Sequence, residues 1–323
     1  MSGQKIVVLG TGGTIAGTSA RAGDNIGYTA AQVGVEHLLQ AVPALQALTD
    51  CHLHTEQVAQ IDSKDMDAPV WRALALRCAH HLQETDVRAI VITHGTDTLE
   101  ETAWFLDQVL AADKPVVLTC AMRPATALTP DGPQNLLDAV AVALTPGAGG
   151  VVAVAAGEVH GARWVQKVHP YRVNAFSSGD IGPLGFVEEG RVRLTRAWPK
   201  NQPSALSGKA LAAIENIVDA AQWPRVEILM SHAGASGAVV NALVRDGVQG
   251  LVVACTGNGT IHQALETPLV RAQASGVRVV RSTRCPEGQV LPKPGDVLPD
   301  SFGLSPVKAR ITLMLDLLGQ GAD

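Results

Sequence analysis

The chain is poor in aromatic residues, and it has no long apolar run. Aromatic side chains make up 3% of its 323 residues and apolar residues 46%, so small aliphatic side chains supply most of the potential core. This composition is more typical of parallel strands covered by helices than of an aromatic-rich sandwich. No apolar stretch is long enough to span a bilayer, so we expect no membrane partner.

Cysteine is also scarce, with five residues that are widely spaced and include no CxxC pair. An odd number at such spacing predicts neither a zinc site nor a dense disulfide framework. The ten histidines include no HExxH motif, and no GxSxG or Walker sequence is present. We therefore expect no bound metal, and most histidines are interpreted as surface or core residues.

The charge is mildly acidic, with a net value of −5 and no basic run longer than two residues. Nucleic-acid grooves and polybasic membrane patches need clustered Lys and Arg, so neither is expected. The first residues carry no basic segment followed by an apolar stretch and a cleavage site. This favours a cytoplasmic protein, or a periplasmic one if a signal has been removed.

Short apolar runs alternate with segments whose apolar residues recur every three or four positions. The runs predict buried strands and the periodic segments predict helices, which together indicate an open, mostly parallel α/β sheet. The predicted strands are 6–9, 89–93, 116–119, 150–155, 227–231, 251–254 and 277–281. The predicted helices are 35–42, 68–83, 99–110, 135–143, 241–246, 261–275 and 306–318.

The alternation breaks between about residues 180 and 224, where Gly and Pro are frequent, and it restarts after Val226. We therefore expect an N-terminal domain at 1–190, a linker at 191–222 and a smaller α/β C-terminal domain at 223–323.

A glycine-rich turn follows the first predicted strand, in the sequence Gly10-Thr11-Gly12-Gly13-Thr14-Ile15-Ala16-Gly17. Such a turn lets the backbone approach a ligand closely and leaves N–H groups available to an anion. A dinucleotide-binding turn is the alternative, but Ile15 occupies the position of its third glycine. The segment that follows also looks helical, where that fold would have a second strand.

A second polar turn, Thr93-His94-Gly95-Thr96-Asp97-Thr98, lies between a predicted strand and a predicted helix. It could simply cap the helix, since several of its residues are good N-caps. It has more such residues than one helix start needs, however, and it follows a buried strand. A carboxylate there can hold an ammonium group. Lys167 alone would be interpreted as a surface charge, but beside these groups it could activate a hydroxyl.

Together these blocks resemble the bacterial-type L-asparaginase/glutaminase family over essentially the whole chain. The two turns are similar to the family's two signatures. Further similar stretches are Val35-Glu36-His37-Leu38, Ala121-Met122-Arg123-Pro124, Asp131-Gly132-Pro133-Gln134-Asn135-Leu136 and Gly257-Asn258-Gly259. The resemblance implies hydrolysis of the side-chain amide of L-asparagine to L-aspartate and ammonia, with lesser glutaminase activity and without a cofactor.

The resemblance also implies a catalytic set. Thr14 would attack the amide carbon and form an acyl-enzyme, and Tyr28 would hydrogen-bond this nucleophile. Thr96, Asp97 and Lys167 would form a second hydroxyl–carboxylate–lysine set near the scissile group. A threonine hydroxyl needs such neighbours, because it is a poor nucleophile at neutral pH.

Substrate-binding residues are implied in the same way. Ser63 would bind the substrate α-carboxylate and Asp97 the α-ammonium, while the backbone carbonyl of Ala121 would face the leaving amide. Backbone N–H groups near Gly13 and Thr96 would form the oxyanion hole.

Three positions depart from the family pattern. Lys64 follows Ser63 where relatives carry Gln or Glu, and it could bind the α-carboxylate or point away. The family also implies a homotetramer in which a neighbouring subunit completes each site. The corresponding positions would be Gly234 and Asp296, or alternatively Asp300.

The sequence leaves other functions open. One is a glutaminase-leaning amidohydrolase, and a related one is a subunit that deamidates glutamyl-tRNA, although no appended domain or basic surface supports it. From a different class, the alternative is a non-catalytic protein that binds amino acids or nucleotides.

Overall fold

The computed structural model describes residues 3–21, 23–199, 207–217 and 219–320, and it separates into two compact units, Met1–Leu211 and Ala212–Asp323. Of the segment predicted as a linker, 191–222, residues 200–206 and 218 lie outside the described residues. Its first part is not a linker: Arg191–Leu194 forms a strand that pairs with the main sheet. Gly182, Pro183 and Gly190, which suggested a linker, flank short antiparallel strands, and Gly185 begins one of them.

The first unit contains an eight-stranded sheet in the order β10-β9-β6-β5-β4-β3-β1-β2. Five strands run parallel: β1 (Lys5–Gly12), β2 (His52–Ile61), β3 (Val87–Thr93), β4 (Val116–Thr119) and β5 (Val151–Ala155). Three strands extend it in antiparallel fashion: β6 (Glu158–Gly161), β9 (Gly185–Glu188) and β10 (Arg191–Leu194). The predicted open, mostly parallel sheet is confirmed.

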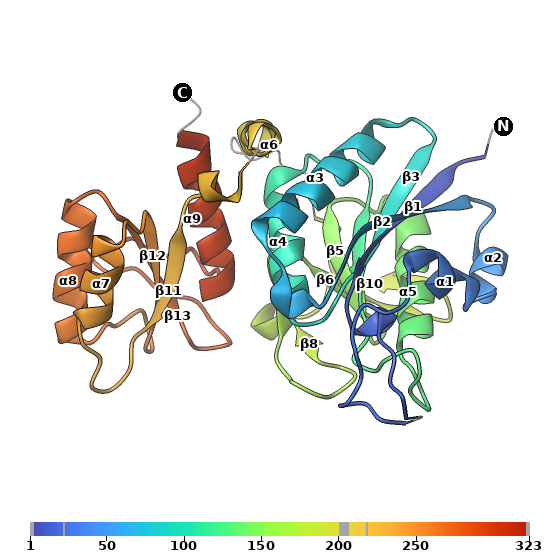
Figure 1. The fold of residues 1–323 in the computed structure, drawn as a ribbon, viewed down its shortest axis with the longest axis horizontal. Helices are drawn as coiled ribbons and strands as arrows, with labels where there is room; N and C mark the ends of the chain where they lie inside the picture. The colour runs from blue at the N-terminus through green and yellow to red at the C-terminus, as the bar shows by residue number, and fades with distance from the viewer. Residues whose placement is uncertain (1–2, 22, 200–206, 218, 321–323) are drawn as a thin grey trace. The chain divides into compact units, whose positions relative to one another are not determined.

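Helices cover both faces of this sheet (Figure 1). On one face lie α3 (Ala68–Gln83) and α4 (Leu99–Val109), and on the other lie α1 (Val35–Gln40), α2 (Ala44–Leu48) and α5 (Gly132–Leu144). The second face buries a continuous aliphatic cluster that includes Ile6, Val91, Val117 and Leu136. Coverage on both faces explains why the central strands read as unbroken apolar runs rather than alternating ones.

The helix α3 shows how local sequence sets an element's limits. Asp67 precedes it and accepts a hydrogen bond from the Val70 amide at 3.0 Å, and a proline occupies its first turn. Its buried positions, Trp71, Leu74 and Cys78, recur at three- and four-residue spacing along one face. The observed bounds equal the predicted 68–83.

The second unit has a three-stranded parallel sheet, in the order β11-β12-β13. Its strands are β11 (Val226–Met230), β12 (Gly250–Cys255) and β13 (Arg278–Thr283). Helices α7 (Ala238–Arg245) and α8 (Gln263–Ala274) lie on one face and α9 (Pro306–Gln320) on the other, and α6 (Ser207–Asn216) precedes the sheet. Within the described residues, no helix is long and apolar enough to cross a membrane.

Strand β2, the ten-residue strand at one edge of the large sheet, was not predicted from the sequence. Its side chains are partly exposed on both faces, so it carries the polar residues of an edge strand rather than an apolar run. The short hairpin of β7 (Gln166–Lys167) and β8 (Phe176–Ser177) was not predicted from the sequence either. Two residues per strand are too few to give a periodic signal.

Candidate active site

The predicted site residues gather because four parallel strands end at the same edge of the sheet. In the order β4-β3-β1-β2, the chain continues from each strand end into a polar turn. These turns carry Ala121 after β4, Thr96 and Asp97 after β3, Thr14 after β1 and Ser63 after β2. The carboxyl edge of such a sheet is where ligands bind in open α/β folds.

Two of these turns touch through their glycines. Gly13 has φ of +79°, and a Cβ atom added there would lie 2.3 Å from Cα of Gly95. A Cβ atom added to Gly95 would lie 2.4 Å from Oγ of Ser63. Only glycine fits at either position, so the turns after β1 and β3 meet at backbone distance and the side chain of Ser63 packs against Gly95. The amide of Gly13 donates to the carbonyl of Ile61 at 2.9 Å and is therefore already engaged.

Thr14 begins a short 3-10 helix, η1 (Thr14–Ala16), and its side chain is hydrogen-bonded to Tyr28. Oγ1 of Thr14 lies 2.7 Å from the phenolic oxygen of Tyr28, and either group can be the donor. Thr14 is 7% exposed, whereas Tyr28 is half-buried. The structure thus brings these two predicted residues together.

The loop that carries Tyr28 is held by hydrogen bonds of its own. Thr18 and Thr29 exchange backbone hydrogen bonds of 2.9 and 2.8 Å. The carboxylate of Asp24 accepts hydrogen bonds from the amides of Ile26 and Gly27 at 2.9 and 2.7 Å. These two amides lower the pKa of Asp24, since they stabilise its charged form. The phenol is therefore positioned before any ligand arrives.

Lys167 joins the second predicted set. Its ammonium donates to Oγ1 of Thr96 at 2.8 Å and to Oδ1 of Asp97 at 2.5 Å. The β7–β8 hairpin supplies the lysine from 70 residues further along the chain. The side chain of Lys167 is 16% exposed and that of Asp97 54%, so the lysine is sheltered while the carboxylate faces solvent. The expected hydroxyl–carboxylate–lysine contacts are present in this geometry.

Ser63 is buried behind these groups, whereas Lys64 is not. The hydroxyl of Ser63 accepts a hydrogen bond from the amide of Asp97 at 3.2 Å. The backbone carbonyl of Ser63 accepts one from the hydroxyl of Thr98 at 2.8 Å. Lys64 forms an ion pair with Asp65, the next residue, and both side chains are more than half exposed. This pair raises the pKa of Lys64. The ammonium of Lys64 is therefore directed to its neighbour.

Two residues without an expected role hold the turn of Ala121. The carboxylate of Asp131 accepts from the amides of Met122 and Arg123, each at 2.9 Å. The side-chain amide of Asn135 donates to the carbonyl of Cys120 at 2.9 Å. Both residues lie in the stretch Asp131–Leu136, which resembles the family. This resemblance could have identified them from the sequence.

His94 lies beneath the turn of Thr96 and is fully buried. Its Nδ1 donates to the carbonyl of Gly95 at 2.7 Å, so Nε2 accepts from the hydroxyl of Thr102 at 2.9 Å. The indole of Trp71 donates to that same hydroxyl at 2.9 Å. Burial lowers the pKa of His94 to about 4, which leaves the ring neutral at physiological pH.

The residues expected from a neighbouring subunit lie in the second unit. Gly234 is in an exposed turn with φ of +74°. Asp296 forms an ion pair of 2.8 Å with Arg281, which lowers the pKa of Asp296, and Asp300 accepts from the amide of Phe302. Among the described residues, one group of histidine and acidic side chains is close enough to share a metal ion, and it lies at the C-terminal end of α3.

Gly13→Ala should destabilise the protein more than Gly147→Ala does. The two glycines have φ of +79° and +76°, but a Cβ at Gly147 has no heavy atom within 4 Å. The control carries only the strain of an L side chain at positive φ, about 1–2 kcal/mol. The clash with Gly95 adds about 1–3 kcal/mol at Gly13. Chemical denaturation measures the free energy of unfolding of both variants. An equal loss of stability in the two would show that the turns of Gly13 and Gly95 do not touch.

The free energy of unfolding should fall as the pH is lowered from 6.5 towards 4.5. The pKa of His94 is about 4 when folded, and the unfolded chain takes up a proton near pH 6.5. Protonation therefore favours unfolding, with a limit of about 3 kcal/mol when both pKa values have been passed. The dependence of the free energy of unfolding on pH should become weaker in His94→Gln. It should not change in His37→Gln, the control, because His37 is exposed. A slope that is the same in all three proteins would contradict this account.

Comparison with known proteins assigns both parts of the chain to one family. Residues 5–200 match the family model "Asparaginase, N-terminal". Residues 225–323 match "Glutaminase/Asparaginase C-terminal domain". The matched ranges together include every element that carries the candidate site.

Individual relatives agree over nearly the whole chain. It is 38% identical to L-asparaginase 2 of Escherichia coli strain K12 and 36% identical to glutaminase-asparaginase of Pseudomonas fluorescens biotype A. Each alignment spans 97% of this chain and 88% or 86% of the relative. The crystal structure of a probable cytoplasmic L-asparaginase from Campylobacter jejuni superposes with a TM-score of 0.89 at 37% identity, covering 99% of this chain and 98% of that one. The chain therefore belongs to the bacterial-type asparaginase family and is an amidohydrolase.

Proposed function

We propose that this enzyme hydrolyses the side-chain amide of L-asparagine to L-aspartate and ammonia, with Thr14 as the nucleophile. The observation that carries the proposal is the hydrogen bond of 2.7 Å between Thr14 and Tyr28. Thr14 stands on the turn after β1, which touches the turn of Thr96 and Asp97, and Lys167 of the β7–β8 hairpin binds both of these residues. Two hydroxyls with adjacent proton-transfer partners thus lie on neighbouring segments, as covalent amide hydrolysis requires.

The reaction would proceed in two steps. Oγ1 of Thr14 attacks the amide carbon while its proton passes to a neighbouring group, and the carbonyl oxygen becomes an oxyanion. The C–N bond then breaks, the nitrogen leaves as ammonia with that proton, and an ester joins Thr14 to the aspartyl group. Water attacks the ester, and aspartate and the free hydroxyl are regenerated. Dividing the reaction lets water attack an ester rather than an amide.

Each surrounding group has a role in this proposal. Tyr28 accepts the hydroxyl proton or relays it, because it is already hydrogen-bonded to Thr14. Lys167 keeps Thr96 oriented and raises the local positive potential, which favours the oxyanion. Since the Gly13 amide donates to Ile61, we assign the oxyanion to backbone amides beside it and near Thr96.

The substrate is a small zwitterion, and we propose that both of its α-groups are anchored. The exposed carboxylate of Asp97 can bind the α-ammonium, since Lys167 engages Oδ1 and leaves the other oxygen. The hydroxyl of Ser63 would donate to the α-carboxylate while it accepts from the Asp97 amide. Two anchors fix the side chain for attack by Thr14. The carbonyl of Ala121 would accept from the leaving amide.

We propose that L-asparagine is preferred and that L-glutamine is hydrolysed more slowly. The names of relatives support a range of activities, since one is an L-asparaginase and another a glutaminase-asparaginase. The two anchors would hold the α-groups of either amino acid in the same place. The additional methylene of L-glutamine would then move its amide away from Thr14. Ammonia release from the two amino acids, measured side by side, tests this preference.

We further propose a cytoplasmic homotetramer, in which the neighbouring subunit contributes the region of Gly234 and Asp296. The second unit exposes large apolar side chains that suit burial between subunits, including Met230 at 58%, Leu291 at 63% and Phe302 at 77%. Within one chain Asp296 is paired with Arg281, so we assign it a supporting role in that loop. The proposed location follows the Campylobacter relative, which is named as cytoplasmic.

Thr14→Ala should abolish amide hydrolysis and leave the fold intact, because the hydroxyl is lost while no backbone changes. Ammonia release would be measured with L-asparagine, together with the melting temperature. The control is Thr145→Ala, which removes a hydroxyl that donates to the carbonyl of Ala141. Activity retained in Thr14→Ala would disprove the nucleophile.

Lys167→Met should lower kcat about 10²–10⁴-fold, the range that positioned proton-transfer groups contribute. The KM should change less, since the proposed anchors Ser63 and Asp97 remain. The control is Lys114→Met, a lysine that donates to the carbonyl of Glu84 at 2.6 Å. If kcat is unchanged while the melting temperature falls, Lys167 is only a structural ion-pair partner.

A further inference from the structure

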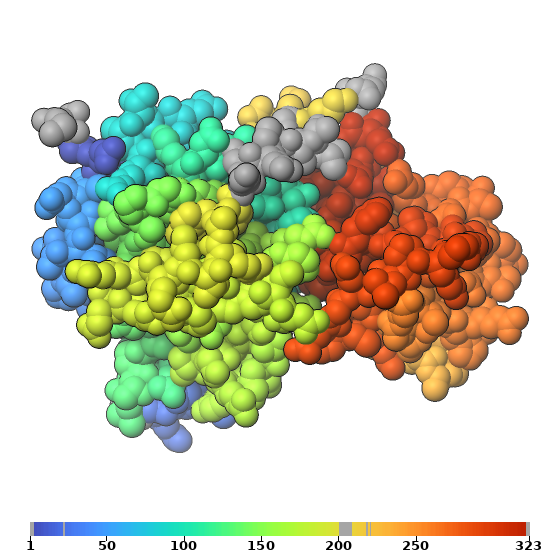
Figure 2. Space-filling view, turned by 180° about the vertical axis from the view of Figure 1, so that it is seen from behind, coloured from blue at the N-terminus to red at the C-terminus, as the bar shows by residue number. Residues whose placement is uncertain are grey.

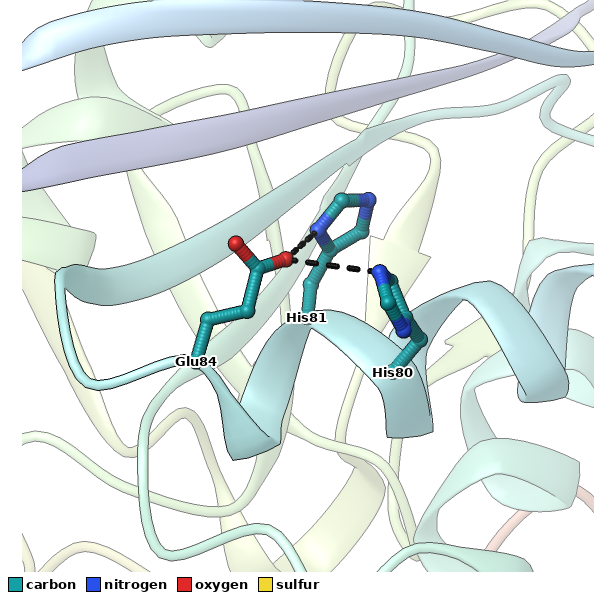
Figure 3. A group of neighbouring side chains, drawn as sticks. All are labelled: His80, His81 and Glu84. Carbon is teal, nitrogen blue, oxygen red and sulfur yellow. Dashed lines mark hydrogen bonds and ion pairs between the residues drawn. The ribbon is translucent and has the colours of Figure 1, made fainter.

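The last turn of α3 and the residue after it bring two histidines and a glutamate together. His80 and His81 are in the last turn, and Glu84 is the C-cap residue. Figure 3 shows both imidazole rings turned towards the carboxylate of Glu84. The three potential ligand atoms all lie within 4.8 Å of one another. Neither the catalytic residues nor the proposed substrate anchors belong to this group.

We propose that His80, His81 and Glu84 bind a divalent first-row transition ion, with zinc as the reference ion. Imidazole nitrogens and a carboxylate oxygen are common zinc ligands, and three protein ligands leave a fourth position for water. The side chain of His80 is 58% exposed and that of Glu84 29%, so the ion has a path from solvent. This inference concerns a site separate from the proposed catalytic function.

The distances suit such an ion after a small adjustment. Oε1 of Glu84 lies 2.6 Å from Nδ1 of His81 and 3.7 Å from Nε2 of His80. In a tetrahedral zinc site the ligand atoms are about 3.3 Å apart, given bonds of about 2.0–2.1 Å. One distance is shorter than this and the other longer. A rotation of the Glu84 carboxylate that lengthens the first distance and shortens the second would bring both towards this value.

The side chains around His81 provide an independent observation, because they are arranged as those around metal-bound histidines are. Nε2 of His81 lies 2.9 Å from the carboxylate of Glu56 and 3.2 Å from Nη2 of Arg77, and this histidine is 3% exposed. Arg77 donates two hydrogen bonds to Glu56, at 2.5 and 2.9 Å. A metal-bound histidine commonly donates its other N–H to a carboxylate, which fixes the ring and leaves the first nitrogen for the ion.

The remaining carboxylate oxygen is held from the other side. Lys5 binds Oε2 of Glu84 at 2.5 Å, which leaves Oε1 directed to the histidines. Nδ1 of His81 and Oε1 of Glu84 lie 2.6 Å apart and share a proton when no ion is bound, and a metal would displace that proton.

The position of the group indicates what the ion would do. The turn of Ser63 precedes α3 at the carboxyl edge of the sheet, and Glu84 follows it, just before β3 begins at Val87. The site is therefore at the amino edge, opposite the catalytic turns. A bound ion would fasten the end of α3 and, through Lys5, the start of β1. It should stabilise the first unit and leave kcat unchanged.

The test is titration of the chelator-treated enzyme with Zn²⁺ by calorimetry, and with Co²⁺ by visible absorption. We expect one ion per chain, a tetrahedral cobalt spectrum and a rise in melting temperature with Zn²⁺. His80→Ala should weaken binding at least 10-fold, and Glu56→Gln about 10–100-fold through loss of the outer carboxylate. His37→Ala is the matched control, because His37 is an exposed histidine in the last turn of another helix.

The outcomes separate the proposal from its alternatives. Binding that is lost in His80→Ala and kept in His37→Ala supports the site. Equal binding in both variants would assign the ion to other surface histidines and overturn the proposal. The absence of saturable binding at millimolar Zn²⁺ would also overturn it, and would leave a proton between His81 and Glu84. His80 is largely exposed, so its loss should not unfold the chain.

Discussion

The backbone of Gly13 lies against the backbone of Gly95, and Gly95 in turn lies against the hydroxyl of Ser63. These contacts join the carboxyl ends of β1, β3 and β2, which are adjacent in the sheet. A side chain at either glycine would separate the turns by more than an ångström, a misplacement that active sites do not tolerate. The positions of Thr14 and Thr96 both depend on this approach.

The positive charge of the site comes from a residue that is distant in the sequence. The turns contribute hydroxyls, backbone amides and the carboxylate of Asp97, whereas the cation that binds Thr96 comes from another segment. Lys167 supplies it from the β7–β8 hairpin, and its sheltered ammonium binds Thr96 and Asp97 together. Sheltering strengthens such interactions, because water screens them less. The buried, neutral His94 supports the same turn from beneath without adding a second charge.

Much of this organisation could be predicted from the sequence, and the remainder has physical reasons for being missed. Buried strands and well-capped helices such as α3 leave clear patterns, so their bounds agreed closely. The edge strand β2 and the two-residue strand that carries Lys167 leave none, since one is half-exposed and the other too short. The family motifs indicated Thr14 and Asp97, but not that Asp131 holds the turn of Ala121 or that Lys64 pairs with Asp65.

The central claim is that the turn after β1 presents a covalent nucleophile. The most direct measurement is acid quenching of the enzyme during turnover of L-asparagine, followed by peptide mapping by mass spectrometry. The account predicts an aspartyl ester on the peptide that contains Thr14, and its absence in Thr14→Ala. An ester on another residue, or burst kinetics with Thr14 unmodified, would contradict it.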